Sequence, residues 1–268
     1  MTFIAAAFRG DLTREWRENH CVASLGGPRD YADLELDDAE RGTWSSELLP
    51  EGWEWRNFSG IFEDVTDNTR KLPEKEYLAE GKYPVIDQGE TLIGGYTNNQ
   101  ELLHRADPPF IIFGDHTRCV KFFAMPFVQG ADGVKVLRTV ANVEPLFGLY
   151  ALSAVILPDK GYSRHMKFLR ATCFPVTRPE EQREIVRHIE TTFSWIDRLA
   201  AEATNARKLI DHLAKAVLAK AFRGELVAQD PRNEPAEVLL ARIKSDREAA
   251  PTLRRRNGNE RLRSRPSA

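Results

Sequence analysis

Cysteine is scarce in this chain of 268 residues, which contains only Cys21, Cys119 and Cys173. No two of these cysteines have the short spacing that a zinc site or a redox motif requires. Three isolated cysteines also exclude the disulfide framework that stabilises many small secreted domains. The sequence therefore indicates a reducing compartment, and we expect a cytoplasmic protein.

Long apolar runs are missing as well. No stretch approaches the roughly 20 apolar residues that a membrane-spanning helix needs. Residues 1–20 carry too many charged side chains for a secretory signal peptide. We therefore expect no association with a membrane.

The chain lacks an excess of charge of one sign, with a formal net charge of -2 and a pI of about 6.3. A nucleic-acid-binding protein of this composition must gather its positive charge locally. Chain length allows one or two domains with a sizeable core.

Familiar catalytic motifs are also absent, including a Gly-rich phosphate loop, a Gly-x-Ser-x-Gly elbow and a His-Glu-x-x-His helix. The pair Asp115-His116 could mark a metal-dependent nuclease. A turn between two strands, in which Asp115 caps backbone groups, explains it better because no second His or acidic partner lies at ligand spacing. We predict no catalytic residue and no metal site.

A long amphipathic segment dominates what is present, from Pro179 to Phe222. Acidic residues open it and Gly224 follows it, as is typical of a helix. Apolar residues recur at heptad spacing, which predicts one long helix, on the order of 60 Å, with a narrow seam for a second helix. The two seam positions fall on Ile189, Ile196, Ala203, Ile210 and Val217, and on Thr192, Leu199, Ala206, Leu213 and Lys220.

A short internal repeat links the two ends of the chain. AFRGDL at residues 7–12 matches AFRGEL at residues 221–226, and both copies sit where a helix would end in glycine. The repeating unit would be a helix end, a linker, a globular domain and a helix. Residues 1–12 then represent the remnant of a preceding spacer helix.

The rest of the chain divides by composition. Residues 13–47 read as an acidic linker, with a short helix over residues 31–41. Residues 48–178 read as a mixed globular domain with strands near 83–86, 110–113, 120–123 and 134–137 and a buried helix near 146–157. Residues 179–226 form the helix, and residues 227–268 contain a short helix near 236–247 and a disordered Arg-rich tail. The fold class is α+β, a mixed β-rich domain followed by one long coiled-coil-forming helix.

Local positive charge does occur between Lys160 and Arg170, in an aromatic and basic segment. A contact to phosphate or to a base edge fits this segment about as well as a structural role. Trp53 and Trp55 could stack on bases. Their place at the start of the domain favours a core position.

Several separated motifs together resemble the specificity subunit of type I restriction–modification systems: LPEGWEW, YPVIDQG, IIFGDHTR, GADGVKVL, GYSRHMKFLR, PEEQREIV and AFRGEL. They occur in family order across most of residues 48–243, so the set is specific although each motif alone is weak. The family usually carries two recognition domains and two antiparallel spacer helices in one chain. This sequence has one of each, and so resembles the carboxy-terminal half of a subunit or a half-length form.

The resemblance implies a non-catalytic subunit that reads one half of a split site in double-stranded DNA. It also implies docking of methyltransferase subunits, which would bind S-adenosylmethionine, while this chain binds no cofactor. The restriction subunit is a further candidate partner, and the seam would be covered by a second copy or by a separately encoded amino-terminal half. The alternatives are the nuclease at Asp115 and His116, or a helical assembly factor without DNA specificity.

The candidate DNA contacts are polar and basic residues expected on loops, which suit base edges and phosphates. They are Asn98, Asn99, Gln100, Arg118, Lys121, Lys135, Arg164, His165 and Lys167.

Overall fold

The computed structural model describes residues 3–20, 25–26, 29–30, 48–158, 164–228, 230, 232 and 234–249. The helix predicted over residues 31–41, residues 159–163 of the basic segment and the Arg-rich tail lie outside these ranges. The chain forms two compact units, Met1–Arg198 and Leu199–Ala268. In the part of the chain that is described, no helix is long and apolar enough to cross a membrane.

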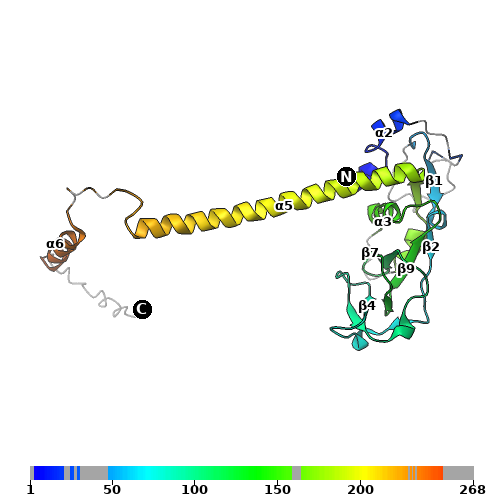
Figure 1. The fold of residues 1–268 in the computed structure, drawn as a ribbon, viewed down its shortest axis with the longest axis horizontal. Helices are drawn as coiled ribbons and strands as arrows, with labels where there is room; N and C mark the ends of the chain where they lie inside the picture. Colours follow the sequence, from blue (N-terminus) through cyan, green and yellow to red (C-terminus); the bar gives the residue numbers. More distant parts are fainter. Residues whose placement is uncertain are drawn as a thin grey trace, which may run out of the picture. The chain divides into compact units, whose positions relative to one another are not determined.

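Two four-stranded sheets and a two-stranded ribbon build the first unit (Figure 1). One sheet has the order β2 (Phe62–Asp64), β9 (Val134–Thr139), β6 (Phe110–Gly114) and β7 (Val120–Phe123), and all its pairs are antiparallel. The other has the order β3 (Lys71–Leu72), β8 (Val128–Gly130), β4 (Tyr83–Ile86) and β5 (Gly95–Thr97). In this second sheet β8 runs parallel to both β3 and β4, so the domain is mixed, as predicted.

The strands expected from short runs of residues with high β propensity are all present, as β4, β6, β7 and β9. Strand β6 is buried over its whole length because it lies between two neighbours at the centre of its sheet. Helix α3 (Pro145–Ala154) forms where a buried helix was predicted near residues 146–157. It begins with a proline, which suits the first helical turn. Strands β2, β3, β5 and β8 were not predicted, because each has only two or three residues and so short a run shows no recognisable pattern.

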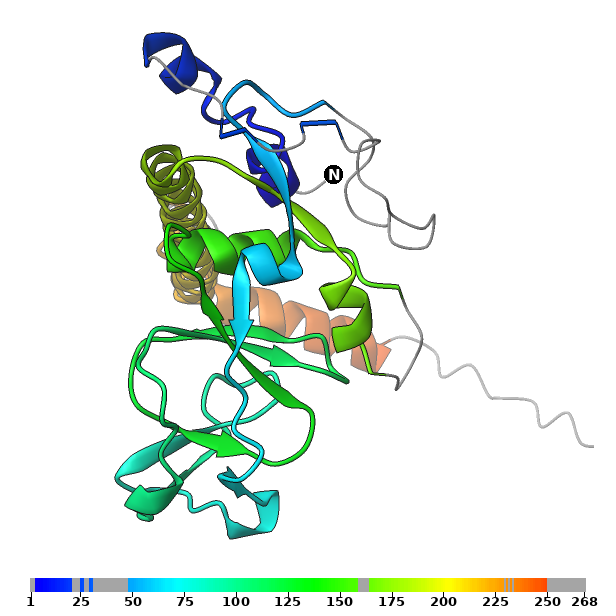
Figure 2. The same ribbon diagram turned by 90° about the vertical axis from the view of Figure 1, so that its right-hand side faces the viewer.

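The ribbon pairs β1 (Glu54–Asn57) with β10 (Cys173–Val176), antiparallel, with Glu54 opposite Val176. It joins the beginning of the domain to its end, directly before the long helix. Trp53, just before β1, and Trp55, within it, are buried, which confirms the core positions expected for them. Figure 2 shows α1 and α2 at one end of the first unit and the sheet that contains β4 at the other, with α3 between them.

Helices α1 (Phe3–Ala7) and α2 (Arg14–Asn19) pack on this unit. Ala7 and Phe8 are buried, and the Phe8 ring lies 5.0 Å from that of Phe147 on α3, measured between centroids. Ala7 and Phe8 therefore belong to the hydrophobic core of the first unit, and Phe3, Ile4 and Leu12 pack against it.

The long helix is present as α5 (Pro179–Phe222), 44 residues in one continuous helix (Figure 1). Its first turns are buried in the first unit, including Ile185 and Ile189. This corrects the prediction for Ile189, because its side chain is covered by its own domain and cannot form part of a seam with another helix. The exposed part of the stripe begins at Ile196.

In the second unit, α5 ends before Gly224, which has the positive φ of 69° expected at a helix C-terminus. Helix α6 (Ala236–Ala249) follows, and its described residues are exposed.

Candidate nucleic-acid interface

The turn between β6 and β7 is the point to which several predicted DNA contacts converge. Buried Asp115 lies in this turn, and its Oδ1 accepts a hydrogen bond of 2.7 Å from the backbone N–H of Met166, at the start of α4 (Met166–Arg170). The carbonyl oxygen of Asp115 accepts another, of 2.9 Å, from the backbone N–H of His165. Asp115 thus joins the turn that carries Arg118 to the segment that carries Arg164 and Lys167.

Three basic side chains are exposed around this junction: Arg118, Arg164 and Lys167. Arg118 has a positive φ of 62°, an uncommon backbone conformation for a residue other than glycine. The ammonium of Lys167 lies 4.7 Å from the centroid of the Phe168 ring. Lys135, on β9, is half-buried and pairs in register with Phe113 of β6. Such a cluster can contact the phosphates of a nucleic acid.

Two of the predicted contacts are not available for this purpose. His165 is fully buried, and one ring nitrogen lies 3.0 Å from the Asp115 carbonyl oxygen. Lys121 is 7% exposed and donates a hydrogen bond of 2.8 Å to the carbonyl oxygen of Asp87. Both side chains hold loops together, so the interpretation of them as direct DNA contacts does not fit the structure.

Arg170, at the end of the basic segment, is held in an ion pair. Its Nη2 lies 2.6 Å from Oδ2 of Asp64. Burial alone would raise the pKa of Asp64, but hydrogen bonds from Thr66 and the Arg170 guanidinium outweigh it and lower that pKa. The pair ties α4 to the end of β2.

A second group of predicted contacts lies on the other sheet. Asn98, Asn99 and Gln100 follow β5 and are exposed. Asn98 Oδ1 accepts a hydrogen bond from the backbone N–H of Lys82, just before β4. At the other end of β4, the backbone carbonyl oxygen of Gln88 accepts a hydrogen bond from the Thr117 hydroxyl in the β6–β7 turn. The structure therefore places the amide group and the basic cluster near opposite ends of β4.

The pair Asp115-His116 has the structural role that the turn interpretation predicted. Asp115 caps backbone groups of a neighbouring segment rather than facing a set of acidic partners. Within the described ranges, no group of three or more His, Cys, Asp or Glu side chains is arranged to hold a metal ion.

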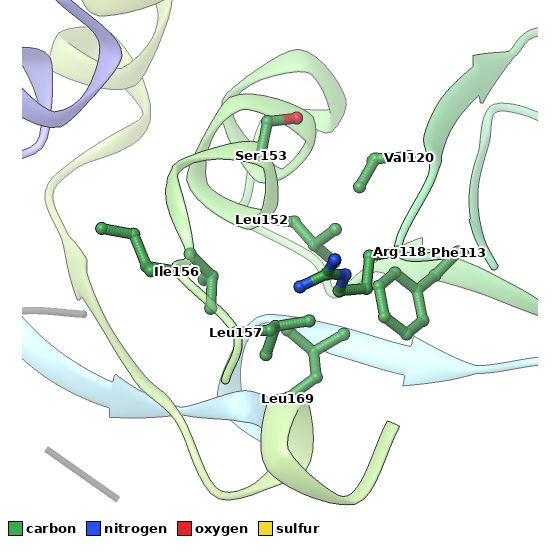
Figure 3. Close-up of a pocket in the computed structure, with 9 residues that line it drawn as sticks. Phe113, Arg118, Val120, Leu152, Ser153, Ile156, Leu157 and Leu169 are labelled. Carbon is green, nitrogen blue, oxygen red and sulfur yellow. The ribbon is translucent and has the colours of Figure 1, made fainter. Parts of the chain in front are cut away.

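An apolar pocket of about 290 Å³ lies beside Arg118. Figure 3 shows the Arg118 side chain directed toward Leu152 of α3 and Leu157, with Leu169 of α4 below them. The pocket can accept an apolar group, with one cation at its rim.

Sequence reasoning missed a buried carboxylate at the start of α5. Glu181 is fully buried, and its Oε1 accepts hydrogen bonds from Thr13 (2.7 Å) and Arg17 (2.6 Å). Its Oε2 accepts from the Trp53 indole (3.0 Å) and the Thr177 hydroxyl (2.6 Å). No local pattern could reveal this cluster, because it joins segments far apart in the sequence.

The heptad stripe of α5 is exposed from Ile196 onward. Ile196 (47%), Ile210 (66%) and Leu213 (62%) have the largest exposed fractions among the large apolar side chains of the predicted seam. Trp195 and Leu209, each one residue before a first seam position, are also exposed, so the apolar surface is wider than the predicted seam. Other seam residues with exposed side chains are Leu199, Ala203 and Val217.

Comparisons with known proteins point to one family. The specificity subunit of the type I restriction enzyme EcoDI from Escherichia coli is 40% identical over an alignment of 281 positions, covering 91% of this chain and 59% of that protein. The EcoBI specificity subunit, also from Escherichia coli, is 37% identical over 141 residues, covering 44% of this chain and 30% of its own length. The chain thus spans less than two thirds of either relative.

A solved structure has a similar fold, with a TM-score of 0.53 at 21% identity over 68% of this chain and 48% of the other. It comes from work on complex assembly and conformational transition of the type I R-M system. No protein-family model matches the chain. Because 91% of this chain aligns with the EcoDI specificity subunit at 40% identity, the chain belongs to the family of type I restriction enzyme specificity subunits.

Proposed function

We propose that this chain is a non-catalytic subunit that recognises one half of a bipartite DNA sequence within a type I restriction–modification complex. The observation that carries the proposal is the 40% identity to the EcoDI specificity subunit across 91% of the chain. The β-rich unit would read DNA, and α5 would set its distance from a second recognition domain.

The exposed basic cluster supports the DNA-binding part of the proposal. Arg118, Arg164 and Lys167 surround a turn that Asp115 holds in place through backbone hydrogen bonds. Phosphate contacts set the register of a protein on a duplex, and base-edge contacts then give specificity. Asn98, Asn99 and Gln100 carry amide groups of the kind that pair with adenine edges.

The exposed stripe on α5 supports the assembly part. A long helix with Ile196, Ile210 and Leu213 facing solvent is stabilised when a second helix covers them. A stiff helix between two recognition domains fixes the length of the unread gap in the site. Methyltransferase subunits would dock on this assembly and supply S-adenosylmethionine, and the restriction subunit would join them.

The decisive experiment maps DNA methylation in the host genome with and without the gene. Loss of one interrupted modified motif supports the proposal and gives the target, its symmetry and its gap. An unchanged methylation pattern, in a strain where the chain and its methyltransferase are both expressed, contradicts it.

A binding measurement provides an independent check. The complex of this chain with methyltransferase subunits should bind one duplex far more tightly than unrelated duplexes, and its affinity should fall steeply with salt. Equal affinity for all duplexes would rule out sequence recognition.

A further inference from the structure

The loop between β4 and β5, residues 87–94, begins at the end of β4 that faces the basic cluster. The hydroxyl of Thr117, in the β6–β7 turn, donates a hydrogen bond of 2.7 Å to the backbone carbonyl oxygen of Gln88. Arg118 is the next residue of that turn and is exposed. The amide group at residues 98–100 is tied to the other end of β4. The 87–94 loop, rather than the amide group, therefore lies beside the expected phosphate contacts.

Hydrogen bonds from neighbouring segments fix the first two residues of this loop. Lys121 on β7 donates to the carbonyl oxygen of Asp87 at 2.8 Å, and its ammonium lies 3.4 Å from Asp87 Oδ1. The Gln88 side chain donates to the carbonyl oxygen of Asp132 at 3.1 Å. It also accepts from the backbone N–H of His116 at 3.4 Å. The β6–β7 hairpin and the turn before β9 thus hold the base of the loop.

The far end of the loop returns closely to β4. The N–H of Gly94 donates to the Val85 carbonyl oxygen at 2.9 Å and closes the loop. A side chain on Gly94 would collide with the Asp87 carboxylate, and an added Cβ on Gly130 would approach the Asp87 Cβ to 2.8 Å. Two glycines therefore let the base of the loop pack tightly, and a rigid base holds the tip in one place.

The tip of the loop faces solvent. Glu90, Thr91 and Leu92 are all exposed. Within the described ranges, no hydrogen bond or ion pair holds the Glu90 side chain. A polar tip on a firmly held loop, which contributes nothing to the fold, is typical of a surface that binds a partner molecule.

A carboxylate at this place has a use only against the bases. Glu90 would repel phosphates, so it weakens a surface that binds the DNA backbone alone. In the major groove, guanine presents two acceptors and thymine a carbonyl acceptor, which a carboxylate cannot pair with. Adenine presents a donor beside an acceptor, which suits an amide. Cytosine presents the N4 amino donor, and a carboxylate accepts from it.

We propose that Glu90 is a specificity-determining residue that accepts a hydrogen bond from the N4 amino group of a cytosine in the major groove. The proposal rests on the proposed function, because it names one base pair of the half-site that the chain would read. The basic cluster beside the loop would set the register on the phosphates, and the fixed base of the loop would direct Glu90 to one position.

The test replaces Glu90 by glutamine in the chromosomal gene and maps DNA methylation in the host. Glutamine keeps the length of the side chain, and its amide pairs with adenine. The unchanged chain should direct an interrupted motif with a cytosine at one fixed position of the half that it reads. Glu90→Gln should accept adenine at that position, and Glu90→Ala should accept several bases there. The other positions of the motif should stay the same.

Binding titrations of the complex with methyltransferase subunits give the magnitude. The probes are duplexes that carry each of the base pairs at the cytosine position. The preference for cytosine over adenine should fall about ten-fold or more in Glu90→Gln, as expected for the loss of one good base contact. The dependence of affinity on salt should keep its slope, because Glu90 neutralises no phosphate.

Glu101→Gln is the matched control. Glu101 is also exposed, but it lies in η4 (Gln100–Leu102), beside the amide group at the other end of β4. This control removes the same charge and should leave the motif unchanged.

The outcomes separate the two proposals. An unchanged motif in Glu90→Gln would overturn the role of Glu90 and leave the proposed function intact. A change confined to a position that is not a cytosine, or the same relaxation in Glu101→Gln, would overturn it as well. An unchanged chain that directs no motif would contradict the proposed function, and the role of Glu90 with it.

Discussion

Nη1 of Arg17 lies 2.6 Å from Oε1 of Glu181, a residue 164 positions later in the chain. The Glu181 side chain is fully buried and that of Arg17 is 14% exposed. This ion pair fastens the N-terminal helices to the first turn of α5. The Trp53 indole donates a hydrogen bond to the same carboxylate, so α2, the start of the β-rich domain and α5 meet at Glu181.

Replacement of Arg17 by methionine should destabilise the chain strongly. The Glu181 carboxylate would stay buried while losing its only cationic partner among the described contacts, and breaking such a pair usually costs about 3–5 kcal/mol. Urea unfolding of the variant and of the unchanged chain measures the difference.

The double variant Arg17→Met/Glu181→Met should recover part of this loss, because no buried charge is left alone. Arg14→Met is the matched control, since the Arg14 side chain is 71% exposed and should matter little. A stability change in Arg17→Met no larger than that of the control would contradict the role given to the pair.

His104 should make stability depend on pH. Its ring stacks on Phe127, with centroids 5.5 Å apart, and its Nε2 lies 2.9 Å from the Val65 carbonyl oxygen. The other nitrogen accepts from the N–H of Ala106 at 3.2 Å, so the folded state suits the neutral ring. Burial lowers the pKa of His104 from its usual 6.5.

Because the folded pKa is the lower one, the unfolded chain binds the proton first as pH falls. The contribution of neutral His104 is fully present above about pH 6.5 and is lost as pH falls through the folded pKa, by at most about 1.4 kcal/mol per pH unit. His104→Gln should reduce this slope in urea unfolding at a series of pH values. His20→Gln, at an exposed position, is the control. Parallel stability curves for His104→Gln and the unchanged chain would exclude the effect.

Arg164 and Lys167 should contribute to DNA affinity without setting its sequence preference. Each replaced by alanine should weaken binding of the complex to all duplexes alike and reduce the salt slope by about one counterion. Binding titrations at several salt concentrations measure both quantities. Lys208→Ala, on an exposed part of α5 in the second unit, should leave the slope unchanged. A change in sequence preference with an unchanged slope would assign these residues to base reading instead.

Pairing of the exposed helix stripe should fail when charge is placed in it. Ile196→Asp with Ile210→Asp would force two carboxylates into the apolar contact, at a cost of several kcal/mol if they stay charged and buried. Sedimentation of the chain with its partner should show the loss of association.

The control for this pair is Ala201→Asp with Thr204→Asp, which adds the same charge on the outward side of the heptad. It should sediment like the unchanged chain. If both variants assemble equally well, α5 does not pair through this stripe.

Local features of the sequence were enough to predict α5, because heptad spacing, acidic residues at the start and a glycine after the end all act locally. The same applies to strands β4, β6, β7 and β9, whose runs are long enough to show β propensity. The repeat of AFRGDL and AFRGEL was visible in the sequence, and both copies end a helix in the same way.

Tertiary structure decided which of those residues are exposed. Ile189 has the same heptad position as Ile196, yet the domain core covers only the former. His165 and Lys121 have the chemistry of DNA contacts, but packing turned them inward against Asp115 and Asp87. Glu181 looked like one of several acidic residues at a helix start. Burial and hydrogen bonding depend on segments brought together from across the chain, and no local pattern contains that information.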